Sequence, residues 1–179
     1  MNRMFFLLTI SLLLLSACSQ KTSAPPGEVV STFLSHIKAG EYTEAYGLLL
    51  GDYPVSLYEM EHTGIFQKLS YDSILEDIQG DKAFVTVNIS SLDFVKLMED
   101  VMAEAFHMIF TDITQYELIS RLESMFMKKM ATYSGPIISN KVTVMLEVYD
   151  GQWKIIADNA FADAMTGGLL SFAEYAGEW

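Results

Sequence analysis

Few residues in this sequence combine the type and the spacing that a chemical site requires. The three histidines, His36, His62 and His107, are far apart in the chain, and no His-x-x-x-His pair or Cys/His set that could bind zinc is present. A Gly-x-Ser-x-Gly nucleophile motif is missing, and so are the glycine-rich loops that bind phosphate groups. The sequence therefore predicts no metal site, no cofactor and no catalytic nucleophile.

The one cysteine, Cys18, follows an N-terminal segment with the pattern of a secretory signal. Arg3 supplies the basic start, residues 4–15 are almost entirely apolar, and Ser16 and Ala17 are small enough for a cleavage site. A transmembrane helix needs about 20 apolar residues, and this run is several residues shorter. The segment is therefore typical of a signal that is removed. An uncleaved N-terminal anchor, and an ordinary signal peptide followed by a chance cysteine, are the alternatives.

The residues Leu15-Ser16-Ala17-Cys18 resemble the lipobox of bacterial lipoproteins. The resemblance implies cleavage between Ala17 and Cys18 and a thioether-linked diacylglycerol on Cys18. Each buried lipid CH2 contributes about 0.8 kcal/mol, so two or more acyl chains hold a protein stably where one does not. We therefore expect the chain to be anchored by Cys18 to the extracytoplasmic face of a cell membrane. Ser19 is compatible with an outer membrane if the host has one.

The chain that remains after this cleavage is strongly acidic. Arg3 is the only charged residue of positions 1–17, so removing them leaves 162 residues and changes the formal net charge from −12 to −13. Such a surface repels nucleic-acid phosphates, so nucleic-acid binding is not expected. It also repels anionic lipid headgroups, so we expect the domain to depend on Cys18 for membrane attachment. With Cys18 lipidated no thiol remains, and stability must come from an apolar core.

The domain organisation follows from length and composition. Residues 1–17 form the predicted signal peptide, and residues 18–27 form the lipidated cysteine with a flexible tether rich in Ser, Pro and Gly. Residues 28–179 are then one domain, because their number is within the usual range for a single core.

Hydrophobic periodicity predicts helices first and an antiparallel sheet later. Two-residue turn signals, Gly80-Asp81 and Asp150-Gly151, separate segments with alternating apolar residues and so predict two β-hairpins. Residues 56–67 are ambiguous, with a break near Gly64 in any short helix there. The expected helices are 28–39, 42–50, 96–110, 115–132 and one from Ala160 capped by Asn159, and the expected strands are 69–79, 82–94, 138–149 and 152–157.

The long helical stretch over residues 96–132 and the apolar C-terminal tail are the two unusual parts of this pattern. Residues 96–132 form a long helical insertion between strands, in which Thr114 and Glu117 have the spacing of a capping box. The C-terminal tail, residues 161–179, is too apolar to stay exposed, so we expect it to fold back over the sheet or to contact a partner. The apolar side expected for the first insertion helix consists of Leu97, Met98, Val101, Met102, Ala105 and Ile109.

The order of elements predicts an α+β fold, a curved antiparallel sheet packed on N-terminal helices with a long helical insertion between strands. Residues 29–49 resemble the opening helix pair of the nuclear transport factor 2-like superfamily, and residues 142–155 resemble its closing hairpin. The resemblance implies a cystatin-like α+β cone, often with a pocket in its mouth. The combination of these two segments with a preceding lipobox is similar to small bacterial lipoproteins of unknown function.

The resemblance leaves three functions open. The first is a non-catalytic domain that binds a small ligand or an envelope partner. The second is a pocket enzyme of the ketosteroid isomerase type, in which an Asp base and a Tyr donor lie inside the cone and burial tunes the acid. The third is a protein-interaction module that uses the 96–132 helices or the tail. The candidate pocket residues are Tyr46, Tyr149, Trp153 and Asp158.

Overall fold

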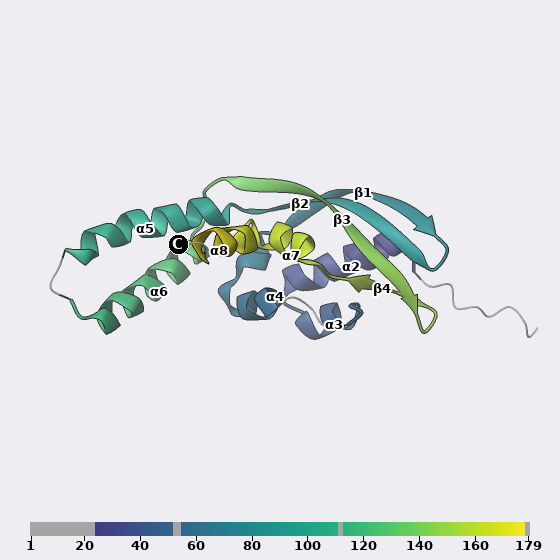
Figure 1. The fold of residues 1–179 in the computed structure, drawn as a ribbon, viewed down its shortest axis with the longest axis horizontal. Coiled ribbons are helices and arrows are strands. Elements are labelled where there is room, and N and C mark those ends of the chain that lie inside the picture. Colours follow the sequence, from purple (N-terminus) through teal and green to yellow (C-terminus); the bar gives the residue numbers. More distant parts are fainter. Residues whose placement is uncertain (1–23, 52–54, 111–112, 178–179) are drawn as a thin grey trace, which may run out of the picture.

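The fold is built on one four-stranded antiparallel sheet with the strand order β1-β2-β3-β4. The computed structural model describes residues 24–51, 55–110 and 113–177. The sheet curves over α2 and α7, and the two helices of the insertion extend away from it (Figure 1). The α+β prediction is therefore confirmed. The strands are β1 (Ser70–Gln79), β2 (Lys82–Leu92), β3 (Ile137–Tyr149) and β4 (Gln152–Ile156).

Both predicted β-hairpins are confirmed, together with their two-residue turns. Gln79 pairs with Lys82 across the first turn, and Tyr149 pairs with Gln152 across the second. In the second turn Asp150 and Gly151 have φ values of 51° and 74°, and a type I′ turn requires positive φ at both central positions. The turn chemistry therefore fixes the register of β3 and β4.

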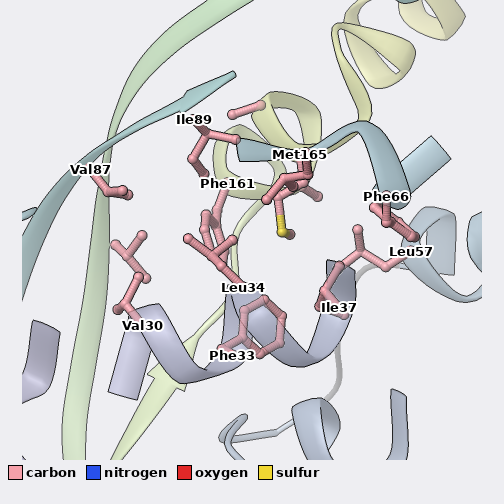
Figure 2. Close-up of a cluster of buried hydrophobic side chains, with 14 of the residues drawn as sticks. Val30, Phe33, Leu34, Ile37, Leu57, Phe66, Val87, Ile89, Phe161 and Met165 are labelled. Atoms are coloured by element: carbon pink, nitrogen blue, oxygen red, sulfur yellow. The ribbon is translucent and has the colours of Figure 1, made fainter. Parts of the chain in front are cut away.

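The core lies between the concave face of the sheet and two helices, α2 (Pro26–Ala39) and α7 (Asn159–Thr166). Strand β2 alternates as predicted, because every second side chain points to this face. Figure 2 shows side chains from α2, α7 and the sheet converging in one apolar cluster. Its fully buried members include Val30, Phe33, Leu34, Ile37, Val85, Val87, Ile89, Phe161 and Met165.

The first helix begins at Pro26, two residues before the expected start. Proline suits the first turn of a helix because its missing N–H has no helical partner there. Pro26 and Gly27 are buried, and a Cβ on Gly27 would overlap the Glu76 carboxylate of β1. The assignment of residues 26–27 to the tether was therefore wrong. Residues 18–23 of the predicted tether, and the whole predicted signal peptide, lie outside the described residues.

The second helix, α3 (Tyr42–Tyr46), is shorter than the expected helix over residues 42–50. Its predicted last turn pairs instead with the edge of the sheet. The Leu50 N–H donates to the Ile155 carbonyl at 2.8 Å, and the Ile155 N–H donates to the Leu48 carbonyl at 2.9 Å. Tertiary hydrogen bonding thus overrides the helical pattern there. The ambiguous segment that follows forms α4 (Val55–Met60), η1 (Glu61–Thr63) and η2 (Ile65–Lys68), with Gly64 at φ 77° marking the expected break.

The insertion consists of two helices, α5 (Phe94–Ile109) and α6 (Gln115–Ala131), which we call the helical hairpin. The Asp93 carboxylate accepts a hydrogen bond from the Lys96 N–H and caps α5. The predicted capping box of α6 is confirmed, with Thr114 and Glu117 each accepting from the other's backbone N–H. Figure 1 shows this hairpin projecting from one end of the molecule.

The tail folds back as predicted, but as two helices, α7 and α8 (Leu169–Gly177). Helix α7 packs on β2 and β3, and α8 packs on α5, where Phe172 contacts the Phe94 ring at 5.8 Å. The expected Asn159 cap was wrong, because the Asp158 carboxylate caps α7. A single helix through Gly167 and Gly168 would be weakened by both glycines, but α7 ends before them, with Gly167 as its C-cap at φ 70°. Trp179 lies outside the described residues.

Candidate functional site

The structure places Tyr46 in a small hydrogen-bonded group between α3 and η1. Its hydroxyl donates to Glu61 Oε1 at 2.6 Å, while the Tyr42 hydroxyl donates to the Glu61 carbonyl at 3.0 Å. The two tyrosine rings are stacked at 6.3 Å. Partial burial and, to a lesser extent, the Glu61 carboxylate raise the pKa of Tyr42. These contacts explain how α3 is held against the following segment without invoking a ligand.

The other three candidate pocket residues lie on β3, on β4 and at the N-cap of α7. Tyr149 is 54% exposed beside the β3–β4 turn. Trp153 pairs with Val148, whereas Tyr149 pairs with Gln152. Paired residues point to the same face and successive residues to opposite faces, so Trp153 and Tyr149 project from opposite faces of the sheet. The Asp158 carboxylate accepts a hydrogen bond from the Phe161 N–H at 2.8 Å and serves as a helix cap. The acid and the tyrosine that a ketosteroid isomerase-like pocket needs are therefore used in separate structural roles.

The region in which the cone resemblance implies a pocket contains packed side chains. Phe33 of α2 and Phe161 of α7 meet there, with ring centroids 5.6 Å apart. The inward residues of β2 approach them from the sheet side, and all of these side chains are shielded from solvent (Figure 2). This packing of apolar side chains stabilises the fold.

The described residues contain neither the side-chain grouping of a metal site nor the long apolar helix of a membrane span. No group of three or more His, Cys, Asp or Glu side chains there is arranged to hold a metal ion. No helix within residues 24–51, 55–110 and 113–177 has both the length and the apolar character needed to cross a membrane.

The most conspicuous surface feature is on the helical hairpin. Six large apolar side chains there are roughly half to four-fifths exposed, and three of them are aromatic. We call them the hairpin surface. Its members are Met102 (55% exposed), Phe106 (57%), Phe110 (76%), Tyr116 (83%), Ile119 (48%) and Met127 (44%).

Helix α5 therefore carries apolar side chains on two faces. One face, with Leu97, Val101 and Ala105, is buried against the rest of the molecule. The other carries Met102, Phe106 and the C-cap residue Phe110, which recur every four residues and so form one stripe. The Phe106 and Phe110 rings contact each other at 5.1 Å. The assignment of Met102 to the buried side was wrong.

The inner face of the hairpin has its own packing and does not need the hairpin surface for cohesion. Phe94 of α5 meets Phe126 of α6 edge to face, with ring centroids 6.2 Å apart. Lys129 Nζ lies 3.0 Å from Glu104 Oε2 and links the two helices further out. Met125 and Met130 of α6 are also buried. The two helices are thus held together by inner contacts, and both also carry exposed apolar side chains.

Comparison with known proteins identifies no relative. No family model matches this chain, and neither does any curated protein or any solved structure. Its function must therefore be inferred from its own residues and geometry.

Sequence reasoning pointed to residues 96–132 as one possible contact region but did not identify Phe106, Phe110 or Tyr116. A signal was present, because Met102, Phe106 and Phe110 repeat at a helical interval offset from the Leu97–Val101–Ala105 stripe. A helix that is apolar on two faces needs two partners. Only one of those partners, the rest of the domain, is present in the described chain.

Proposed function

We propose that this chain is a lipid-anchored, extracytoplasmic lipoprotein whose domain is a non-catalytic protein-binding module. Cys18 carries the lipid, and the hairpin surface binds a protein at the cell envelope. Small-ligand binding and ketosteroid isomerase-like catalysis receive less support, because Tyr46 and Asp158 are engaged in structural hydrogen bonds and the concave side of the sheet is packed with side chains.

The observation that carries this proposal is the exposure of six large apolar side chains on one projecting element. Single exposed apolar residues are ordinary on protein surfaces, but Met102, Phe106 and Phe110 form a continuous stripe on α5, and such a group is typical of an interaction site. Aromatic residues and Met are also the residue types that interfaces favour. The contact between α5 and α6 uses other side chains, such as Phe94 and Phe126.

The position of the hairpin supports the same function. The start of α2 lies beside β1, near the β1–β2 turn, whereas α5 begins where β2 ends, at the opposite end of the sheet (Figure 1). An eleven-residue strand spans about 35 Å, and a sixteen-residue helix adds about 24 Å. An anchor on the N-terminal side would therefore leave the hairpin surface far from the point of attachment, where it can meet a partner.

The anchor is tested by replacing the only sulfur atom that could carry the lipid. We expect Cys18→Ser to move the protein from the membrane fraction to the soluble or unprocessed fraction, measured by fractionation and by the mass of the N-terminal peptide. Unchanged membrane attachment would refute the lipoprotein assignment.

Protein binding is tested by photo-crosslinking in intact cells, with benzoylphenylalanine placed at position 106. Tyr149 is the matched control position, since it is aromatic and exposed to a similar degree but lies on the β-hairpin. We expect a discrete crosslinked protein product from position 106 and none from position 149. Equal yields from both positions, or no product from either, would contradict a specific role for the hairpin surface.

A further inference from the structure

We propose that the protein bound by the hairpin surface is a second copy of this chain, so that two helical hairpins associate into a four-helix bundle. This inference rests on the proposed protein-binding function and names the partner. It follows from the distribution of charge, from the amount of exposed apolar surface and from the two-fold symmetry that a pair of identical hairpins permits.

Charge singles out the hairpin as the place where two copies can approach. The chain carries a net charge of −12, so most of its surface repels a second copy. Helix α6 has a formal charge of +1 and is the one α-helix of the described chain with a net positive charge, whereas α5 has −2. The charged residues are Lys96, Glu99, Asp100 and Glu104 on α5, and Glu117, Arg121, Glu123, Lys128 and Lys129 on α6.

This asymmetry makes the hairpin complementary to itself. In a two-fold dimer, a residue of one copy that contacts a given residue of the other is matched by the reverse contact. If α5 of one copy lies against α6 of the other, both contacts pair an acidic helix with a basic one. The Glu104–Lys129 ion pair at 3.0 Å already joins these two helices within one chain. Arg121 and Lys128, the other basic residues of α6, are exposed and can face the acidic α5 of the second copy.

Both helices of the hairpin carry exposed apolar side chains that such a bundle would cover. Met102, Phe106 and Phe110 follow one face of α5, and Tyr116, Ile119 and Met127 are exposed on α6. From the typical area of aromatic side chains, covering the hairpin surface would remove on the order of 600 Å2 from water on each copy. A typical specific interface buries about 800 Å2 per partner, and the charged flanks can supply the remainder.

A membrane is the other class of occupant for an exposed apolar hairpin. It fits less well, because α5 carries a net negative charge beside the stripe and the cytoplasmic or outer leaflets that carry anionic lipid would repel it. Interfacial helices are usually rich in Lys and Arg on their polar face. A second copy satisfies both the apolar stripe and the acidic flank of α5, whereas a bilayer satisfies only the stripe.

The test uses the full-length chain in cells that express two versions with different epitope tags. Benzoylphenylalanine is placed at position 106 of one version, and the crosslinked product is probed for the tag of the other. We expect a product that carries both tags. A charge-reversal variant, Arg121→Glu with Lys128→Glu, should lower its yield at least several-fold, because both side chains are exposed and the acidic α5 of the second copy would then face an acidic α6.

The two proposals fail in different ways. A position-106 product that contains a different protein would overturn the second-copy inference and leave the protein-binding function intact. Crosslinking to lipid alone would overturn both, and so would the absence of any product. A charge-reversal variant with an undiminished two-tag product would overturn the α5–α6 pairing. Unchanged thermal unfolding of that variant serves as the control for its fold.

Discussion

Gly167 shows how closely the tail approaches the sheet. Its carbonyl accepts a hydrogen bond from the Phe94 N–H at 3.0 Å, and its φ of 70° lies in the left-handed region. A Cβ at this position would overlap the carbonyl oxygen of Leu92 and approach the Ser91 hydroxyl. Glycine is therefore required here for two reasons, the backbone conformation and the space. The same contact sets where β2 ends and α5 begins.

Replacing Gly167 with alanine should separate these two effects when it is compared with a matched glycine. Gly40 has a similar φ of 78°, but a Cβ added there would meet no atom within 4 Å, so Gly40→Ala should lower the free energy of unfolding by about 1 kcal/mol. Gly167→Ala should lower the free energy of unfolding by on the order of 2 kcal/mol more, because the backbone must move to relieve the overlap. Urea denaturation of both variants measures this. Equal losses would mean that the contact at Leu92 relaxes without cost.

Tyr42 makes stability sensitive to alkaline pH. Burial and the Glu61 carboxylate raise its pKa above that of an unfolded tyrosine, near 10. The folded state thus binds this proton more tightly, so the contribution to stability is complete below about pH 10 and is lost as the pH rises through the folded pKa. Tyr42→Phe should flatten the loss of stability between pH 9 and pH 11. Chemical denaturation across that range tests this, and an unchanged slope would rule out Tyr42 as the cause.

At the scale of elements, the capping box of α6 determines where the helical hairpin turns back. Thr114 Oγ1 accepts a hydrogen bond from the Glu117 N–H, and Glu117 Oε2 accepts one from the Thr114 N–H. These hydrogen bonds lower the pKa of Glu117. They satisfy backbone groups at the start of α6 that have no helical partner. The orientation of Tyr116 and Ile119 on the hairpin surface depends on this start.

We expect Thr114→Ala to lower the free energy of unfolding by about 1 kcal/mol, the usual cost of losing a helix N-cap. The stabilising carboxylate form of Glu117 is present above the ordinary pKa of a glutamate and is lost as the pH falls through its lowered folded pKa. Alanine keeps the backbone N–H at position 114 but removes the hydroxyl that donates to Glu117 Oε2, so the difference between wild type and Thr114→Ala should shrink in acid. Denaturation at neutral pH and near pH 3 measures it, and a difference independent of pH would argue against this hydroxyl–carboxylate hydrogen bond.

Local chemistry explains which elements could be predicted from the sequence. The Asp150-Gly151 turn, the Thr114–Glu117 box and the alternation of β2 depend on residues close together in the chain, and all three are confirmed. The α+β architecture follows from their order. The end of α3 could not be predicted, because Leu50 hydrogen-bonds with Ile155, more than 100 residues away.

The candidate site was harder to predict for the same reason. Tyr46 and Asp158 were chosen because tyrosine and aspartate can do acid–base chemistry, but their hydrogen-bond partners depend on how α3 and α7 pack. Which apolar face of α5 is buried depends on the position of α6 and α8, and no local pattern specifies that position. The anchor at Cys18 stays a prediction.

At the scale of the whole molecule, the start of the folded domain differs from the sequence-based expectation. A flexible tether over residues 18–27 would allow residues 20–26 to be deleted with almost no change in stability. The structure predicts a loss instead, because the Val29 N–H donates to the Pro25 carbonyl at 3.1 Å and Pro26 is buried in the first turn of α2. We expect a decrease on the order of 1 kcal/mol or more from the lost helix start. Thermal unfolding of the deletion variant measures it, and an unchanged midpoint would return Pro25 and Pro26 to the tether.

The start of α2 and the helical hairpin lie at opposite ends of the sheet, and this placement has a mechanical consequence (Figure 1). Tension between an anchored N-terminus and a partner held by the hairpin would run along the length of α2, parallel to its contact with the sheet (Figure 1). Phe33, Leu34 and Ile37 would then have to slide past the strands together rather than separate one after another. Resistance to a short pull depends on the unfolding rate rather than on equilibrium stability. With an anchor at Cys18 and a partner on the hairpin, both of which we propose, the load would therefore run along the long axis of the domain.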